Sequence, residues 1–168
     1  MIVPRHFEDL GVLHEHTLPS RAYYVPASRR IATSPWRRED SDRFHLLSGQ
    51  WAFKYLPSIH ELTEAFWEQE APEVVDKSDE PAPAVPEGFT MIQVPSTWQH
   101  LGHDHHQYTN VRYPIPFDPP HVPQDNPCGA YIRDFEYTPD PAAPSTYLTF
   151  EGVDSCFYVW LNGTYVGY

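Results

Sequence analysis

The fold is decided by the stretch FYVWLNGTYVGY, residues 157–168, at the C-terminal end of the sequence. A run of aromatic and aliphatic residues leads to Asn162-Gly163, and a second aromatic run begins at Tyr165. Asparagine and glycine tolerate the positive φ angles of a type I′ turn, which joins two antiparallel strands. The stretch therefore predicts a β-hairpin. Because the returning strand has barely begun at Tyr168, we expect a sandwich that is incomplete at its C-terminus.

Further strand signals lie upstream of this hairpin. In FHLLSGQWAFKY, residues 44–55, large aromatic residues alternate with smaller or charged ones from Trp51 onward, which is the period of a half-buried strand. One short helix is predicted at 57–70, because Ser58 can cap it and Glu61 follows three residues later. Its apolar face would hold Leu62, Phe66 and Ile59. Other strands are expected at 91–94, 129–137, 146–151 and 157–161.

The composition favours the same architecture. Aromatic residues make up 15% of the chain, and aromatic rings are common both in sandwich cores and on sugar-binding surfaces. The 19 prolines are spread along the chain, which disfavours long helices and favours short strands joined by rigid loops. With several strands, one short helix and no alternation of strands with helices, the sequence predicts an all-β, antiparallel β-sandwich.

Two segments stand apart from this domain pattern. Residues 1–43 contain four well-spaced prolines and most of the arginines, and they predict an extended N-terminal arm that packs on the domain or on a neighbouring subunit. The domain itself would span 44–168. Within it, residues 71–88 are acidic and proline-rich and predict an exposed loop. Residues 101–127 have almost no regular pattern, and a loop of this length in a compact domain is usually functional or disordered.

Charge and cysteine content narrow the classes of partner and compartment. The net charge of -12 argues against nucleic-acid binding and gives no reason to expect attachment to an anionic membrane. No run of about 18 apolar residues is present, so no membrane span is predicted. The start, MIVPRHFEDLG, lacks the pattern of a secretory signal. Cys128 and Cys156 are too few for a disulfide framework, and we expect reduced thiols in a cytoplasmic protein.

Several groups that could carry chemistry have simpler explanations. The run HDHH at 103–106 lacks the distant Cys or His pair that would complete four zinc ligands, so no metal site is predicted. Neither cysteine has the electropositive surroundings of a reactive thiolate. Glu151 and Asp154 are the best-placed carboxylates for glycosidase chemistry, but Asp154 fits a turn after Gly152. No catalytic residue is therefore predicted in this chain.

The loop QYTNVRYP, residues 107–114, is more informative. The amide of Asn110 both donates and accepts hydrogen bonds, which suits the vicinal hydroxyls of a sugar. Tyr108 and Tyr113 could wall such a site. From the chemistry alone, a substrate-contacting loop and a packed structural loop are equally consistent with these residues.

Three blocks of the sequence carry a family resemblance. They are SGQWAFKY (48–55), VPSTWQHLGHDHHQYTNVRYPIPFDPPHVPQDNPCGAY (94–131) and FEGVDSCFYVWLNGTYVGY (150–168). Together they resemble the amino-terminal domain of bacterial β-galactosidases in glycoside hydrolase family two. The middle block is similar to β-galactosidases in particular, whereas the outer two are shared in outline with β-glucuronidases and β-mannosidases. The arm, with DLGVLHEHTLPSRAYYVP (9–26), also resembles the start of the family.

The resemblance implies a fold and a division of labour. This section would form a jelly-roll sugar-binding domain preceded by the arm, with the catalytic acid and nucleophile far downstream in a TIM barrel. The family's Asn-Val loop reaches into the active site of that barrel, so Asn110 and Val111 are the expected substrate-binding residues. The full-length enzyme would hydrolyse terminal β-D-galactosides such as lactose with retention. Its Mg²⁺ and Na⁺ sites would belong chiefly to residues outside this chain.

The resemblance also bears on assembly. In relatives the arm helps subunits associate, which implies a homo-oligomer and a role for residues 1–43. Two other functions stay open on the sequence alone: a stand-alone carbohydrate-binding module, and an association subunit of a split β-galactosidase. The galactosidase function, by contrast, requires a further strand and a barrel after Tyr168.

Overall fold

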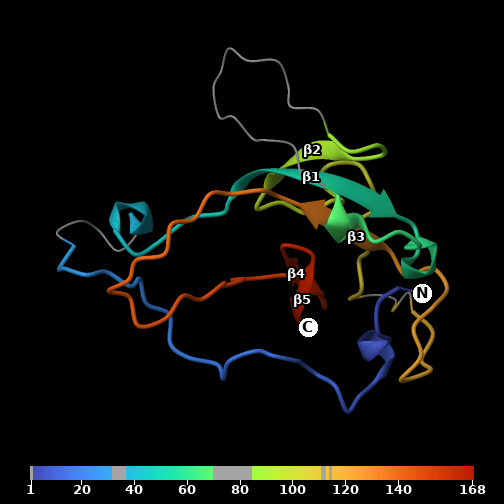
Figure 1. Ribbon diagram of the computed structural model, residues 1–168. Helices are drawn as coiled ribbons and strands as arrows, with labels where there is room; N and C mark the ends of the chain where they lie inside the picture. The colour runs from blue at the N-terminus through green and yellow to red at the C-terminus, as the bar shows by residue number, and fades with distance from the viewer. Residues whose placement is uncertain (1, 32–36, 70–84, 111–112, 114) are drawn as a thin grey trace.

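The structure, a computed structural model, describes residues 2–31, 37–69, 85–110, 113 and 115–168. The described residues form two antiparallel sheets. In the first sheet, β1 (Gly49–Leu56) lies between β2 (Thr90–Val94) and β3 (Cys128–Ile132). The second sheet is the hairpin of β4 (Val159–Leu161) and β5 (Thr164–Gly167), which lies below the first sheet in Figure 1. The all-β, antiparallel prediction is confirmed.

The only helical segments in the described parts of the chain are four 3₁₀ turns of three residues each. None of the described residues forms a helix that could cross a membrane. The turns are η1 (His6–Glu8), η2 (Arg38–Asp40), η3 (Ile59–Glu61) and η4 (Phe66–Glu68).

The central strand β1 is covered on both faces. Ala52 and Phe53 point to opposite faces because they are neighbours in a strand, yet their side chains are 0% and 1% exposed. The expectation of a half-buried strand was therefore wrong for this segment. The physical reason is that the chain after β2 folds back over the Phe53 face, while the core covers the Ala52 face.

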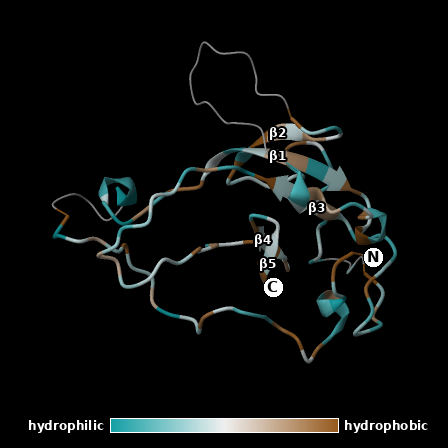
Figure 2. Cartoon of the chain, in the orientation of Figure 1, coloured by the Kyte–Doolittle hydropathy of each residue, from teal (hydrophilic) through white to brown (hydrophobic). Residues whose placement is uncertain are grey.

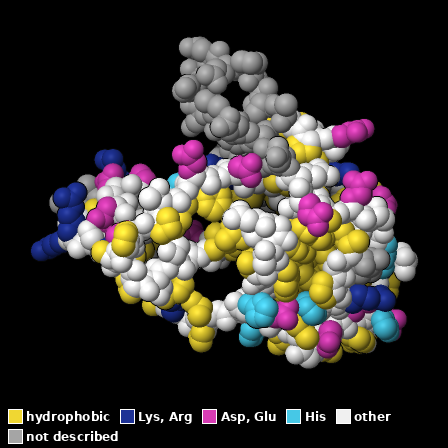
Figure 3. All heavy atoms as spheres, in the orientation of Figure 1, with side chains coloured by type: hydrophobic (Ala, Val, Ile, Leu, Met, Phe, Trp, Pro, Cys, Tyr) yellow, Lys and Arg dark blue, Asp and Glu magenta, His cyan; other side chains and the backbone are white. Residues whose placement is uncertain are grey.

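The main core lies between the three-stranded sheet and the hairpin. It combines small residues of the sheet, such as Ala52 and Ala130, with buried side chains from the 3₁₀ turns and the arm. Tyr158 and Trp160, which precede or belong to β4, pack against this cluster and join the two sheets. Hydrophobic side chains gather over the same part of the molecule in the space-filling view (Figure 3). The buried members of the cluster are Val3, Ala52, Leu56, Ile59, Leu62, Phe89 and Ala130.

The predicted hairpin is present with the predicted turn. Asn162 and Gly163 have φ angles of 50° and 72°, the left-handed values that a type I′ turn requires at both positions. The strands pair through Leu161 and Thr164 beside the turn, and their register shifts between Val159 and Trp160.

The helix predicted at 57–70 is absent, but the residues predicted for its apolar face do contact the core. Two short 3₁₀ turns replace it, although Ser58 does cap the first by accepting a hydrogen bond from the His60 backbone N–H at 3.3 Å. Ile59 and Leu62 are buried in the core, and Phe66 packs against it. The two separate turns thus bring the three side chains that were predicted to share one helix face to the same core.

Four strand predictions were too long, including the one at 157–161, where β4 begins only at Val159. The strand predicted at 44–55 begins only at Gly49, and that predicted at 129–137 ends at Ile132, where the partner register on β1 reaches Ala52. Beyond Ile132, hydrogen bonds from a side chain replace backbone pairing: the Arg133 guanidinium donates to the carbonyl oxygens of Leu47 and Ser48 at 2.9 and 3.1 Å. Residues 146–151 are extended but pair with no strand among the described residues, so they do not form the expected strand.

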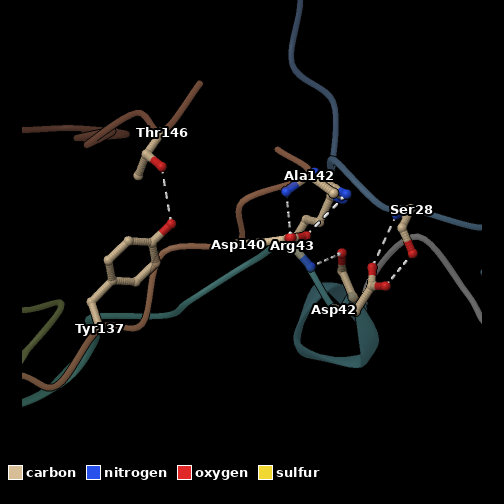
Figure 4. Close-up of polar contacts among 8 residues, drawn as sticks. Ser28, Asp42, Arg43, Tyr137, Asp140, Ala142 and Thr146 are labelled. Atoms are coloured by element: carbon tan, nitrogen blue, oxygen red, sulfur yellow. Dashed lines mark hydrogen bonds and ion pairs between the residues drawn. The ribbon is translucent and has the colours of Figure 1, made fainter. Parts of the chain in front are cut away.

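The extended arm is held against its own chain at several points. The Arg38 guanidinium forms an ion pair with Glu151, and Arg43 forms one with Asp140 at 3.0 Å between Nη2 and Oδ2. Figure 4 shows the second of these contacts beside the hydrogen bond between the Tyr137 and Thr146 hydroxyls. Most of the arm's backbone follows no regular element, and its hydrophobic stretches alternate with hydrophilic ones (Figure 2).

The N-terminal part of the arm pairs with the hairpin edge. The backbone N–H of Glu15 donates to the Tyr168 carbonyl at 2.9 Å, and the Tyr168 N–H donates to the Glu15 carbonyl at 3.1 Å. A Cβ placed on Gly167 would lie 2.8 Å from the Glu15 carbonyl oxygen, so glycine permits this close approach. The predicted arm and domain boundary at residues 43 and 44 stays a prediction, and the acidic loop at 71–88 lies mostly outside the described residues.

Candidate functional site

The long loop between β2 and β3 is fixed at its beginning by an aromatic stack. The Trp98 ring lies on Phe53 with 6.2 Å between ring centroids, and the His103 ring meets the edge of Phe53 at 5.0 Å. The His103 backbone N–H also donates to the Trp98 carbonyl at 3.1 Å. Tyr131, opposite Phe53 on β3, closes the stack at 4.8 Å. The loop therefore starts from a rigid platform on the sheet.

A glycine of β3 makes room for that platform. Gly129 lies opposite Tyr55 on β1, and a Cβ at this position would be 2.7 Å from Cζ3 of Trp98 and 2.8 Å from Cε2 of Phe53. Both distances are shorter than real side-chain contacts. The absence of a side chain at Gly129 thus lets the Trp98 ring lie close against the sheet.

The end of the loop is fixed by hydrogen bonds to other segments. The Ser58 hydroxyl donates to the Gln124 carbonyl at 2.7 Å, and the Ile59 N–H donates to the Asn126 carbonyl at 2.8 Å. Nearer the tip, the Val122 N–H donates to Oε1 of Glu8 at 3.1 Å. This bond, aided by the neighbouring Arg5, lowers the pKa of the Glu8 carboxyl.

The tip of the loop is exposed. Asn110 is exposed, and its Nδ2 donates to the Tyr108 hydroxyl at 3.4 Å. Tyr108 and Tyr113 are 72% and 65% exposed, so both rings are accessible. The structure thus brings Asn110 next to one of its two predicted wall residues, whereas Val111 lies outside the described residues.

The loop tip presents the kinds of group that a polyhydroxylated ligand requires. The Asn110 side chain keeps its carbonyl oxygen available as an acceptor, and exposed tyrosine rings offer flat apolar faces and hydroxyl groups. The loop tip itself carries no pair of facing carboxylates among the described residues, so acid–base cleavage of a glycosidic bond would need groups from elsewhere.

The other candidates are used structurally. His103 packs on Phe53, and Asp104 accepts a hydrogen bond from the His105 N–H at 2.7 Å. In the described parts of the chain no three His, Cys, Asp or Glu side chains are arranged to hold a metal ion. Glu151 is engaged by Arg38, which lowers the pKa of its carboxyl.

The two cysteines differ in their surroundings. Both are free; Cys156 is exposed, whereas burial raises the pKa of the half-buried Cys128 thiol to about 11. A thiol with so high a pKa is a poor nucleophile at neutral pH. The structure therefore offers no cysteine-based chemistry at Cys128.

Two contacts that hold the loop in place were not predicted from the sequence. Glu8 contacts Val122 across 114 residues, and no local pattern signals such a contact. Trp98 and Gly129 contact each other across the sheet, and a tryptophan just after a predicted strand was the one signal that could have pointed to this anchor.

Comparison with known proteins agrees with this architecture. Residues 44–168 match the family model of the glycosyl hydrolases family 2 sugar binding domain. The whole chain is 42% identical to a β-galactosidase of Actinobacillus pleuropneumoniae and, over 169 aligned residues, 37% identical to one of Staphylococcus xylosus. A β-galactosidase 2 of Enterobacter cloacae is 40% identical over 73% of the chain.

The relatives are much longer than this chain. The chain spans about 15% of the length of the first two relatives and 10% of the third. The matched region contains both sheets and the long loop between β2 and β3. The chain therefore belongs to glycosyl hydrolase family 2, through the sugar-binding domain of that family.

Proposed function

We propose that this chain is the N-terminal sugar-binding section of a β-galactosidase and that its long loop contributes a substrate contact. The observation that carries the proposal is the similarity of the whole chain to proteins named β-galactosidase, at 42% and 37% identity. The full-length enzyme would hydrolyse terminal β-D-galactosides, including lactose, with retention. Its catalytic carboxylates would lie in a barrel domain outside this chain.

Asn110 is the proposed substrate-binding residue, with Val111 beside it in the pocket wall. The exposure of Asn110 supports this role, because a loop tip that is free of the sheet can reach a neighbouring domain. Its amide would exchange hydrogen bonds with galactose hydroxyls, and the nearby Tyr108 ring would limit the directions from which the sugar can approach.

Ions and assembly complete the proposal. Mg²⁺ and Na⁺ would support the full-length enzyme, but the described residues bring together no donor set of three or more His, Cys, Asp or Glu for them. Their ligands would therefore come chiefly from outside this chain. A homo-oligomer in the cytoplasm, with the arm contributing to subunit association, is part of the same proposal.

The substrate contact is tested by Asn110→Ala in the full-length enzyme. Loss of a hydrogen bond to a ligand costs about 1–3 kcal/mol, so kcat/KM for a nitrophenyl β-D-galactoside should fall roughly 5- to 150-fold. Gln93→Ala, which removes an exposed amide on β2, is the control and should leave the kinetics within about twofold. Unchanged kinetics for Asn110→Ala would remove this residue from the site.

The division of labour is tested with the 168-residue chain by itself. It should show no turnover of the same galactoside, because the proposal assigns both catalytic carboxylates to another domain. Activity in a homogeneous preparation would contradict that assignment and would favour a catalytic role for this chain.

A further inference from the structure

The arm contacts the long loop through the largely buried carboxylate of Glu8. The Glu8 side chain is only 10% exposed although it carries a charge, and its two oxygens face different partners. Oε1 accepts from the Val122 N–H at 3.1 Å, whereas Oε2 forms an ion pair with the guanidinium of Arg5. A carboxylate held in this way is a charge-assisted acceptor, which binds a backbone N–H more strongly than a neutral group does.

Among the described residues of the loop, Val122 is the first after the tip to make a long-range hydrogen bond, and its partner is Glu8. Between Asp104 and His121, the described residues make only local hydrogen bonds, such as those from Asn110 to Tyr108 and from the His121 N–H to Asp118 at 2.9 Å. The bonds of the Gln124 and Asn126 carbonyls lie further toward β3. The direction in which the exposed tip leaves the domain is therefore limited on its C-terminal side by the bond at Val122.

We propose that Glu8 is a positioning residue for substrate binding: its carboxylate fixes the returning branch of the loop at Val122 and thereby orients Asn110 toward the galactoside. The inference rests on the proposed function, because it assumes that Asn110 contacts the sugar. Glu8 itself touches no substrate.

The energetics favour a role for Glu8 in holding the loop over the alternative that it is only a solvated surface carboxylate. Val122 is half-buried, so its N–H would lose a partner if the carboxylate were removed, and a buried unpaired donor is costly. Arg5, which is 59% exposed, neutralises the carboxylate and keeps one oxygen directed at Val122. In the described parts of the chain, the hydrogen bond that joins the arm to the loop is the one between Glu8 and Val122.

A double-mutant cycle in the full-length enzyme tests the proposal. Glu8→Ala should raise KM for a nitrophenyl β-D-galactoside about 3- to 10-fold with kcat within about twofold, the smaller end of a lost hydrogen bond. Combining it with Asn110→Ala should raise KM no further than Asn110→Ala alone, since Glu8 acts through that residue. Glu8→Gln, which keeps an acceptor oxygen, should have a KM within about twofold of the wild-type value.

Hydrogen exchange supplies a readout other than activity. Peptides covering 115–122 should exchange faster in Glu8→Ala, whereas Glu39→Ala, which removes an exposed carboxylate on η2, should leave both exchange and KM unchanged. Should Glu8→Ala not fold, Arg5→Ala offers a milder change at an exposed residue, with KM expected to rise about two- to threefold.

The outcomes separate the two proposals. Faster loop exchange with wild-type KM in Glu8→Ala would overturn the positioning role, as would KM effects of Glu8→Ala and Asn110→Ala that multiply in the double variant. Unchanged exchange and KM in Arg5→Ala would also overturn it if Glu8→Ala is unusable. Failure of the proposed substrate contact is seen separately, as unchanged kinetics of Asn110→Ala in the wild-type background.

Discussion

Substitution of Gly129 by alanine should loosen the platform from which the long loop starts. The new methyl group would lie 2.7 Å from Cζ3 of Trp98 and 2.8 Å from Cε2 of Phe53, so at least one ring must move. Phe53 is 1% exposed and sits in the central strand, which leaves it little room. Inserting a methyl group into a packed site of this kind costs about 1–3 kcal/mol.

The effect can be measured locally by hydrogen exchange in the full-length protein. If the cost falls on local opening of the sheet, the backbone amides of β1 and β3 should exchange about 5- to 150-fold faster, since 1.4 kcal/mol corresponds to a factor of ten. Peptides covering 49–56 and 128–132 contain the paired residues. The segment around Trp98 and His103 should become less protected as well.

Gly152→Ala is a matched control. A Cβ at Gly152 meets no atom within 4 Å, and its backbone does not require glycine, so exchange throughout the two sheets should be unchanged. If Gly129→Ala behaved like this control, the Trp98 ring would not lie against Gly129 as described, and the account of the loop anchor would be refuted.

Three further outcomes follow from the packing and the charges. Phe53→Ala should destabilise the domain by about 3–5 kcal/mol, measured as a lower denaturation midpoint, because it empties the centre of the aromatic stack; a loss below about 1 kcal/mol would contradict this. At pH 8 a disulfide reagent should label Cys156 at least tenfold faster than Cys128, whose pKa of about 11 leaves roughly 0.1% thiolate, and equal rates would contradict the burial. The Arg38 contact lowers the pKa of Glu151, so its stabilising effect is present above the ordinary carboxyl pKa of 4.5 and is lost as pH falls through the lower folded value. Glu151→Gln should therefore destabilise the protein at pH 7 and have little effect well below the lowered pKa, as followed by thermal unfolding at both pH values.

Sequence reasoning worked where the interactions are local. Asn162-Gly163 specifies its turn through its own backbone preferences, and Ser58 caps the next turn through an adjacent N–H. The irregular character of the described residues between 101 and 127 was also predicted from the sequence pattern. Each of these features depends on residues within a few positions of one another.

The errors arose where distant segments decide the outcome. The strand predicted at 146–151 has the right composition but finds no partner among the described residues, and a strand exists only when a neighbour pairs with it. Phe53 and Ala52 are both buried because a loop 45 or more residues later covers one face. At the candidate site, the family resemblance supplied the prediction of Asn110, which stays a prediction, whereas no local pattern indicates the contact of Glu8 with Val122, 114 residues away in the sequence.

The pairing of Glu15 with Tyr168 has a consequence for the order of events during synthesis. Glu15 and Tyr165, which also share a hydrogen bond of 2.6 Å, are 150 residues apart in sequence. A ribosome adding about 5–20 residues per second needs roughly 8–30 s to make the intervening chain, and contacts of such high sequence separation form slowly. The first part of the arm therefore leaves the ribosome well before its docking partner exists, and its Leu10 and Leu13 are exposed even in the folded protein. During that interval the nascent arm is available to a chaperone, and an antibody or peptide that captures it should block maturation only if it is added before residue 165 has emerged.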